Sequence, residues 1–248
     1  MLAIIGGSGL TTLPNLQITG RKVVRTPYGE PSCPLTFGTI RDRPVVFLAR
    51  HGYGHTIPPH AVNYRANLWA LQAEKVRAVV SVASVGGIRR DLTPGVIAIP
   101  DQIIDYTHGR AFTFYESDAT PVTHIDFTHP YCERTRALCI EAARRAGEPV
   151  VVGGVYAATQ GPRLETAAEI DRLERDGADM VGMTGMPEAA LARELSLSYA
   201  ALAVVANYAA GRADSAEGIR MEDVAKVLKG AMARVRNILE HVVEAYGD

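Results

Sequence analysis

Residues 1–9 read MLAIIGGSG, a short apolar run that changes at once into glycine and serine. Such a run, ended by glycines, is typical of a buried strand followed by a tight turn. No basic segment precedes it, so we expect a first strand rather than a signal peptide. The same combination of apolar run and small residues recurs along the chain and decides the fold class.

Short apolar runs alternate with segments of helical periodicity. The predicted strands are Ala3–Ile5, Val45–Ala49, Val79–Val85, Val96–Ile99, Val150–Tyr156, Met180–Met183 and Ala200–Ala206. The predicted helices are Ala61–Glu74, Tyr131–Ala146, Glu165–Asp176, Pro187–Leu195 and Met221–Tyr246. Runs that are apolar on both faces suit a sheet covered by helices. With no repeat or linker in view, we predict one α/β domain over residues 1–248.

Composition excludes several partner classes. The 26 basic and 27 acidic residues give a net charge of −1, so no basic field is available to hold nucleic acid. No apolar stretch approaches the ~20 residues of a membrane helix. The three cysteines, Cys33, Cys132 and Cys139, form no CxxC pair and argue against a disulfide framework or a structural zinc site. We expect a cytoplasmic protein with small-molecule ligands.

Polar groups suited to an anion follow several predicted strands. Ser8 lies in the first glycine turn, Arg50 and His51 follow Val45–Ala49, Ser84 lies at a second small-residue turn, and Thr184 follows Met183. Glycine turns expose N–H groups, and arginine offers a fork for phosphate oxygens. The first turn lacks the third glycine of a dinucleotide site and the Gly-Lys-Ser/Thr of a P-loop. Each of these groups alone could belong to an ordinary turn at a strand end, so the prediction depends on all of them lying close together in space.

His51, His55 and His60 could also be read as metal ligands. No nearby acidic residue completes such a set, and Arg50 would repel a cation. We therefore predict no metal.

Five ordered motifs then resemble a known family. They are GGSGL at 6–10, RHGxxH at 50–55, NYxAN at 63–67, GPRxET at 161–166 and GMTxxPE at 182–188. In this order they are similar to the trimeric purine nucleoside phosphorylases, and most of all to the branch that takes 5′-methylthio nucleosides. The resemblance implies a mixed, partly barrel-like sheet flanked by helices, a homotrimer, inorganic phosphate as cosubstrate, and no cofactor or metal.

The resemblance also implies roles for individual residues. Phosphate contacts fall on Ser8, Arg50, His51, Ser84 and Thr184. Substrate contacts fall on Met183, Asn207, Ala209, His55 and His124, with His124 near the 5′ end of the nucleoside across a subunit interface. In the implied reaction, phosphate attacks C1′ while hydrogen bonds from Asn207 stabilise the charge on the departing purine.

Two positions indicate the substrate. Relatives that use 6-aminopurines carry Asp at the position of Asn207 and a second Asp at that of Ala209. An amide can donate to a 6-carbonyl, so Asn207 favours hypoxanthine or guanine, unless it merely caps a turn. Met221 stands where inosine-specific relatives carry a histidine, and Val224 follows one helical turn later. A thioether and a valine suit a methylthio group, although both could be ordinary core residues.

Three departures from the family pattern concern the same pocket. Ala83 replaces a phosphate-binding threonine, Leu164 replaces an aromatic residue that packs on the base, and Glu165 replaces a smaller or different polar residue near the purine. We predict phosphorolysis of 5′-methylthioinosine, a pentosyl transfer in purine salvage. The alternatives are a methylthioadenosine phosphorylase, a general inosine/guanosine phosphorylase, and a non-catalytic nucleoside-binding protein.

Overall fold

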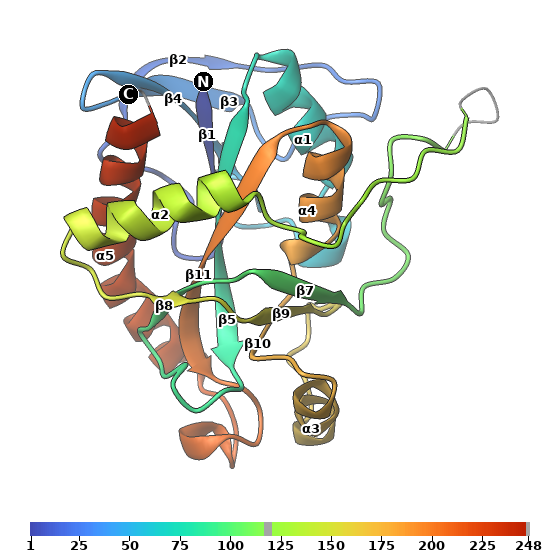
Figure 1. Cartoon of the computed structure of the whole chain (residues 1–248), viewed down its shortest axis with the longest axis vertical. Helices are drawn as coiled ribbons and strands as arrows, with labels where there is room; N and C mark the ends of the chain where they lie inside the picture. The colour runs from blue at the N-terminus through green and yellow to red at the C-terminus, as the bar shows by residue number, and fades with distance from the viewer. Residues whose placement is uncertain (117–120, 247–248) are drawn as a thin grey trace.

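A mixed sheet of eleven strands runs through the centre of the computed structural model, which describes residues 1–116 and 121–246 (Figure 1). The strands are β1 (Leu2–Gly6), β2 (Gln17–Lys22), β3 (Leu35–Ile40), β4 (Arg43–Ala49), β5 (Ala78–Gly87), β6 (Ile97–Ile99), β7 (Gln102–Asp105), β8 (Val151–Val152), β9 (Val155–Ala158), β10 (Met180–Gly182) and β11 (Ser198–Tyr208). The helices are α1 (Tyr64–Ala73), α2 (Glu133–Arg145), α3 (Ala167–Arg175), α4 (Gly185–Glu194) and α5 (Met221–Tyr246), with 3-10 turns at Pro59–Ala61 and Ala213–Ser215.

The sheet branches at β5. Its main path is β2-β3-β4-β1-β5-β10-β9-β7, while β11 lies along the other edge of β5 and continues to β6 and β8. β1 runs parallel with both of its neighbours, β4 and β5, and β11 runs parallel with β5, whereas β10 runs antiparallel to β5. The predicted central mixed sheet flanked by helices is confirmed.

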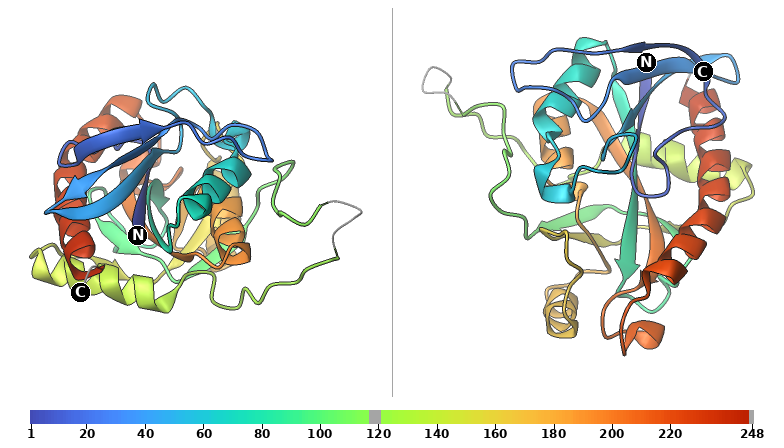
Figure 2. Two further views of the ribbon diagram at one scale, coloured as in Figure 1. Left: turned by 90° about the horizontal axis from the view of Figure 1, so that it is seen from above. Right: turned by 180° about the vertical axis from the view of Figure 1, so that it is seen from behind.

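Helices cover the buried strands in two groups. α2 and α5 pack on each other and on β11, and α1 packs on α4 (Figures 1 and 2). In the last predicted helix, most of the apolar residues that recur every three or four positions are buried, including Leu228, Val235 and Val242. Burial of such a stripe against a sheet is the main source of stability for a long helix. No helix of the described residues is both long and apolar enough to cross a membrane.

Some predicted elements were wrong or missing. The single strand predicted over 150–156 is two strands, because Gly153 and Gly154 adopt φ values of 85° and 127° between β8 and β9. A strand cannot continue through two residues with positive φ. β2, β3 and β7 were not predicted. β2 is exposed along most of its length and has no apolar alternation, so its sequence carries no strand signal.

The register along β5 places the site. β1 pairs with residues 78–81 of β5, and β10 pairs with residues 86–87 while running in the opposite direction. Both strands therefore end facing each other along the same edge of β5, and the edge between them is uncovered. The turns that follow β1 and β10 meet at this interruption of the sheet.

Candidate active site

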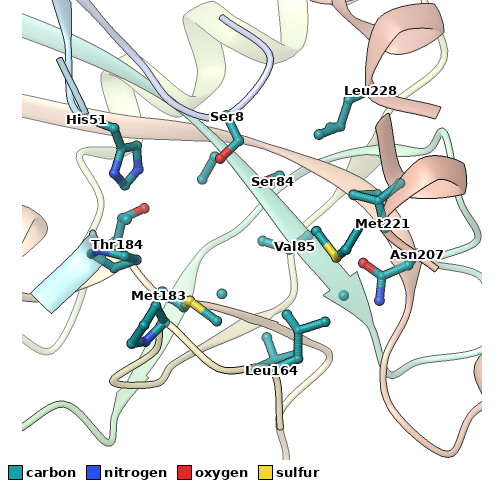
Figure 3. A pocket seen from close by; sticks show the side chains of 18 of the residues that line it. Ser8, His51, Ser84, Val85, Leu164, Met183, Thr184, Asn207, Met221 and Leu228 are labelled. Atoms are coloured by element: carbon teal, nitrogen blue, oxygen red, sulfur yellow. The ribbon is translucent and has the colours of Figure 1, made fainter. Parts of the chain in front are cut away.

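A cavity of about 520 Å³ occupies this interruption. Its floor includes Ala83, Ser84 and Val85 of β5, and its sides come from the turns after β1, β4 and β10, the end of β11 and the start of α5 (Figure 3). This size is within the range of small-molecule sites.

The structure brings thirteen of the fourteen predicted site residues together around this cavity. They are Ser8, Arg50, His51, His55, Ser84, Leu164, Glu165, Met183, Thr184, Asn207, Ala209, Met221 and Val224. His124 does not line it. That residue is exposed and belongs to the connection between β7 and α2, part of which extends away from the body of the molecule in Figure 1.

Arg50 is almost wholly buried and forms an ion pair with Glu188 of α4. Its Nε donates to Glu188 Oε2 at 2.6 Å and its Nη2 to Glu188 Oε1 at 2.8 Å. Nη2 also donates to Ser81 Oγ at 2.5 Å and Nη1 to the carbonyl of Val82 at 3.1 Å. Burial alone would lower the pKa of Arg50, but the carboxylate of Glu188 more than offsets this and raises it. These bonds use four of the five guanidinium donors, so one Nη1 hydrogen is left for a ligand.

His51 has a defined tautomer. Its Nδ1 lies 2.7 Å from the carbonyl oxygen of Ile57, which can only accept, so Nδ1 carries the proton. Burial, reinforced by the charge of Arg50, lowers the pKa of His51 to about 4. The neutral ring therefore leaves Nε2 as an acceptor at physiological pH. His55 stacks at a tilt beside it, with ring centroids 4.7 Å apart, and burial lowers its pKa as well.

Hydroxyl groups complete the polar end of the cavity. Ser8 Oγ lies 3.4 Å from His55 Nε2, and Thr184 is buried at the start of α4, with its N–H donating to Tyr156 Oη at 3.4 Å. Figure 3 shows Ser8, His51 and Thr184 on one side of the cavity. Ser84 lies within β5 rather than after it, because the strand extends to Gly87 instead of ending at Val85.

Asn207 lies on the opposite side of the cavity from His51 in the view of Figure 3. The pairing of β11 with β5 shifts register between Val205 and Asn207, so a bulge sets the direction of the Asn207 side chain. Its Nδ2 donates to the carbonyl of Tyr208 at 2.6 Å. Oδ1 and the second amide hydrogen are left to face a ligand.

The start of α5 forms an apolar wall. Met221, Val224, Ala225 and Leu228 all line the cavity, and their spacing of three, one and three residues places them on one helix face. We predicted only the first two as site residues. The same helical stripe, extended by one turn, would have identified the other two.

Leu164 and Glu165 lie on a third side, in the segment before α3. Leu164 is 40% exposed, and Glu165 accepts a hydrogen bond of 2.6 Å from the Thr159 hydroxyl. Glu165 is therefore held at the cavity edge by its own segment.

Some residues that shape the site were not predicted. Glu188 belongs to the GMTxxPE motif but has no predicted role, although a charged residue in the apolar run at the start of this helix is a signal for a buried ion pair. Tyr156 and Arg110 gave no sequence signal. Among the described residues, no three His, Cys, Asp or Glu side chains gather so that they could hold a metal, and His60 lies outside the cavity lining.

The arrangement combines two chemistries in one cavity. One side offers hydroxyls and an arginine hydrogen as donors and the neutral His51 ring as an acceptor, which together suit a small oxyanion that still carries a proton. The other offers an amide and an apolar helix face, which suit a flat polar heterocycle with an apolar substituent.

Comparison with known proteins agrees with this geometry. Residues 1–244 match the model of the phosphorylase superfamily. The chain is 50% identical over 243 residues, 98% of each chain, to a probable S-methyl-5′-thioinosine phosphorylase of Pseudomonas syringae pv. tomato. It is 48% identical over 215 residues, 85% of this chain and 80% of the relative, to a 6-oxopurine nucleoside phosphorylase of Pyrococcus furiosus.

The fold of this chain is also similar to that of a solved structure. Methylthioadenosine phosphorylase from Schistosoma mansoni, in complex with adenine, superposes with a TM-score of 0.95 at 35% identity, covering 99% of this chain and 91% of that one. Sequence and structure therefore agree that this chain belongs to the phosphorylase superfamily, as a member of its nucleoside phosphorylases.

Proposed function

We propose that this protein cleaves S-methyl-5′-thioinosine with inorganic phosphate, giving hypoxanthine and 5-methylthioribose 1-phosphate. The observation that carries the proposal is the placement of Asn207 and the Met221–Val224 wall in the same cavity as Ser8, His51 and Thr184. The relatives named for this activity, or for 6-oxopurine nucleosides, support it.

In the proposed reaction a phosphate oxygen forms a bond to C1′ as the C1′–N9 bond breaks. The bonding electrons leave with the purine, which gains at its imidazole ring the proton that the attacking hydrogen phosphate gives up. Ser8, Arg50, Ser84 and Thr184 donate to the phosphate and hold it near C1′, a positioning effect. Met183 contacts the ribose. Asn207 stabilises the negative charge that develops on the base.

The choice of base depends on what an amide can do. The second Nδ2 hydrogen of Asn207 can donate to a 6-carbonyl, while Oδ1 can accept from N7–H of hypoxanthine. A 6-amino group would instead meet a donor. Ala209 supplies no carboxylate that could accept from it, and Glu165 and Leu164 border the base.

The 5′ substituent is proposed to lie against Met221 and Val224, where a thioether is favourable and a hydroxyl has no partner. We propose that His124 and His55 complete the substrate contacts, with His124 supplied by a neighbouring subunit of a homotrimer. The exposure of His124 in the isolated chain supports this arrangement. A single domain over residues 1–248, a cytoplasmic location and independence of metal or cofactor are part of the same proposal.

The test compares kcat/KM for methylthioinosine, methylthioadenosine and inosine, each with and without phosphate. We expect phosphate-dependent release of hypoxanthine, with methylthioinosine preferred. A tenfold or greater preference for methylthioadenosine would overturn the assignment of Asn207. Release without phosphate would indicate a hydrolase, and no release would indicate a binding protein. Sedimentation analysis of the same preparation tests the trimer.

A further inference from the structure

Arg110 is a buried arginine next to the cavity that none of the proposed roles uses. It follows β7, at the start of the stretch that leaves the body, and only 8% of it is exposed. Its Nη1 donates to two backbone carbonyls of the turn after β10, those of Met183 at 2.8 Å and Met186 at 2.6 Å. These carbonyls flank Thr184 and Gly185.

The other nitrogens of Arg110 hold a second segment. Nη2 donates to the carbonyls of Gln160 at 2.8 Å and Thr159 at 3.2 Å, and Nε donates to the Gln160 side chain at 3.2 Å. One rigid planar group therefore joins the turn after β10 to the segment after β9. A guanidinium is suited to this because its five donors have a fixed geometry.

Both segments carry cavity residues. Met183 and Thr184 belong to the first, and Leu164 and Glu165 follow the second by a few positions. The Thr159 hydroxyl in turn holds Glu165. The Arg110 side chain therefore fixes where the proposed phosphate and ribose contacts lie relative to the proposed base contacts.

The hydrogen-bond partners of Arg110 are also unusual for a buried charged side chain. Within residues 1–116 and 121–246 its hydrogen-bond partners are carbonyl oxygens, one amide oxygen and the hydroxyl of Tyr64, all of them neutral. Arg50, by contrast, has the carboxylate of Glu188. A buried cation is costly compared with an apolar side chain of similar volume. A positive charge that no carboxylate neutralises attracts anions to the part of the cavity wall that is nearest to it.

We propose that Arg110 is a positioning residue for this cavity. It fixes the Met183–Thr184 turn against the segment that leads to Glu165, and it places a positive charge behind the anion end. This inference rests on the proposed phosphorolysis, because it assumes that an anion binds beside Thr184.

The test uses Arg110→Met and Arg110→Lys, with Arg136→Lys as a matched control. Arg136 is also buried and also donates to a backbone carbonyl, that of Pro100 at 2.9 Å, but it does not line the cavity or hold its segments. For each protein we would measure kcat, KM for phosphate, KM for methylthioinosine, and the rise in Tm caused by inorganic phosphate.

We expect Arg110→Met to lower kcat/KM for phosphate by about 10²-fold, since small misplacements of reacting groups have effects of this size. Arg110→Lys should recover part of the phosphate affinity, because lysine keeps the charge but has only three donors. Arg136→Lys should keep wild-type kcat and KM. A role in folding alone would reduce the active fraction or Tm without raising KM for phosphate.

The inference is overturned if folded Arg110→Met keeps wild-type kcat and KM for phosphate, or if Arg136→Lys loses as much. Should Arg110→Met fail to fold, Arg110→Lys decides in the same way. If the wild-type protein itself shows no phosphorolysis, the proposed function fails. The phosphate-induced rise in Tm then tests Arg110 separately: a smaller rise in Arg110→Lys supports it, and an equal rise overturns it.

Discussion

The two ends of the cavity are built in opposite ways. At the anion end, Arg50 is 1% exposed and its guanidinium is held by groups on β5 and α4. At the apolar end, Met221 is the first residue of α5 and is 63% exposed. The anion end is therefore part of the core, whereas the apolar end begins at the surface with Met221 and reaches the core only at Leu228.

This difference indicates how the proposed reaction and its specificity are divided. Binding phosphate needs donors fixed in space, and these are most rigid when they are packed into the sheet. Choosing among 5′ substituents needs only a few apolar contacts, which a helix end can supply and exchange without disturbing the core. Substitutions at the anion end should therefore change the stability of the whole protein. Substitutions at the apolar end should instead change kcat/KM for one substrate relative to another.

The largest effect is expected from Glu188→Gln, which removes the charge that compensates Arg50 while keeping the side-chain shape. An uncompensated buried arginine should lower the free energy of unfolding by about 3–5 kcal/mol. Denaturant unfolding measures this.

The control is Glu244→Gln, which breaks an exposed ion pair with Arg41. That change should cost less than about 1 kcal/mol. If Glu188→Gln lowers the free energy of unfolding by no more than this control does, the buried ion pair is not what makes the anion end rigid.

Asn207→Asp should exchange the base preference, since a carboxylate accepts where the amide donates. We expect kcat for methylthioinosine to fall by about 10²–10³-fold, as for loss of a donor to a developing oxyanion, and relative activity toward methylthioadenosine to rise. Asn207→Ala should instead lower activity toward both nucleosides. Equal losses in the two variants, with no change of preference, would contradict the role of the amide.

A third prediction concerns pH and His51. The pKa of His51 is about 4 in the folded protein, against an ordinary value of 6.5. Between these values the unfolded chain binds the proton and the folded chain does not, so stability falls as pH falls. The loss reaches the order of 3 kcal/mol near pH 4. Unfolding of wild type and His51→Gln at several pH values should show a shallower decline in the variant, and parallel curves would refute the assignment.

The smallest effect is expected at the apolar end. Met221→Ala should lower kcat/KM for methylthioinosine by about 10-fold, the lower end of the range for lost apolar contacts in a pocket because Met221 is more than half exposed, and leave inosine nearly unchanged. Lys229→Ala, on the same helix but outside the cavity lining, is the control. A similar loss with both nucleosides would show that Met221 supports the helix rather than the substituent.

Much of this architecture could be predicted from local patterns. The β1 strand and its glycine turn, the long β5 and β11 strands and the full extent of α5 follow from apolar runs and helical periodicity, which are local properties. β2 and β7 could not be predicted in this way, since they form because neighbouring strands offer them edges. The break between β8 and β9 is a local feature that the predicted single strand misses, because its cause, the adjacent Gly153 and Gly154, is present in the sequence.

The sequence by itself determined which chemical groups were available: hydroxyls and an arginine after strands, an amide at position 207, and an apolar face at the start of the last helix. Only the tertiary structure decided how they are used. Arg50 and Glu188 are 138 positions apart, and their pairing depends on α4 packing against α1 and β11. The tautomer of His51, the gap along β5 and the convergence on Arg110 likewise arise from contacts between distant segments, which no local pattern specifies.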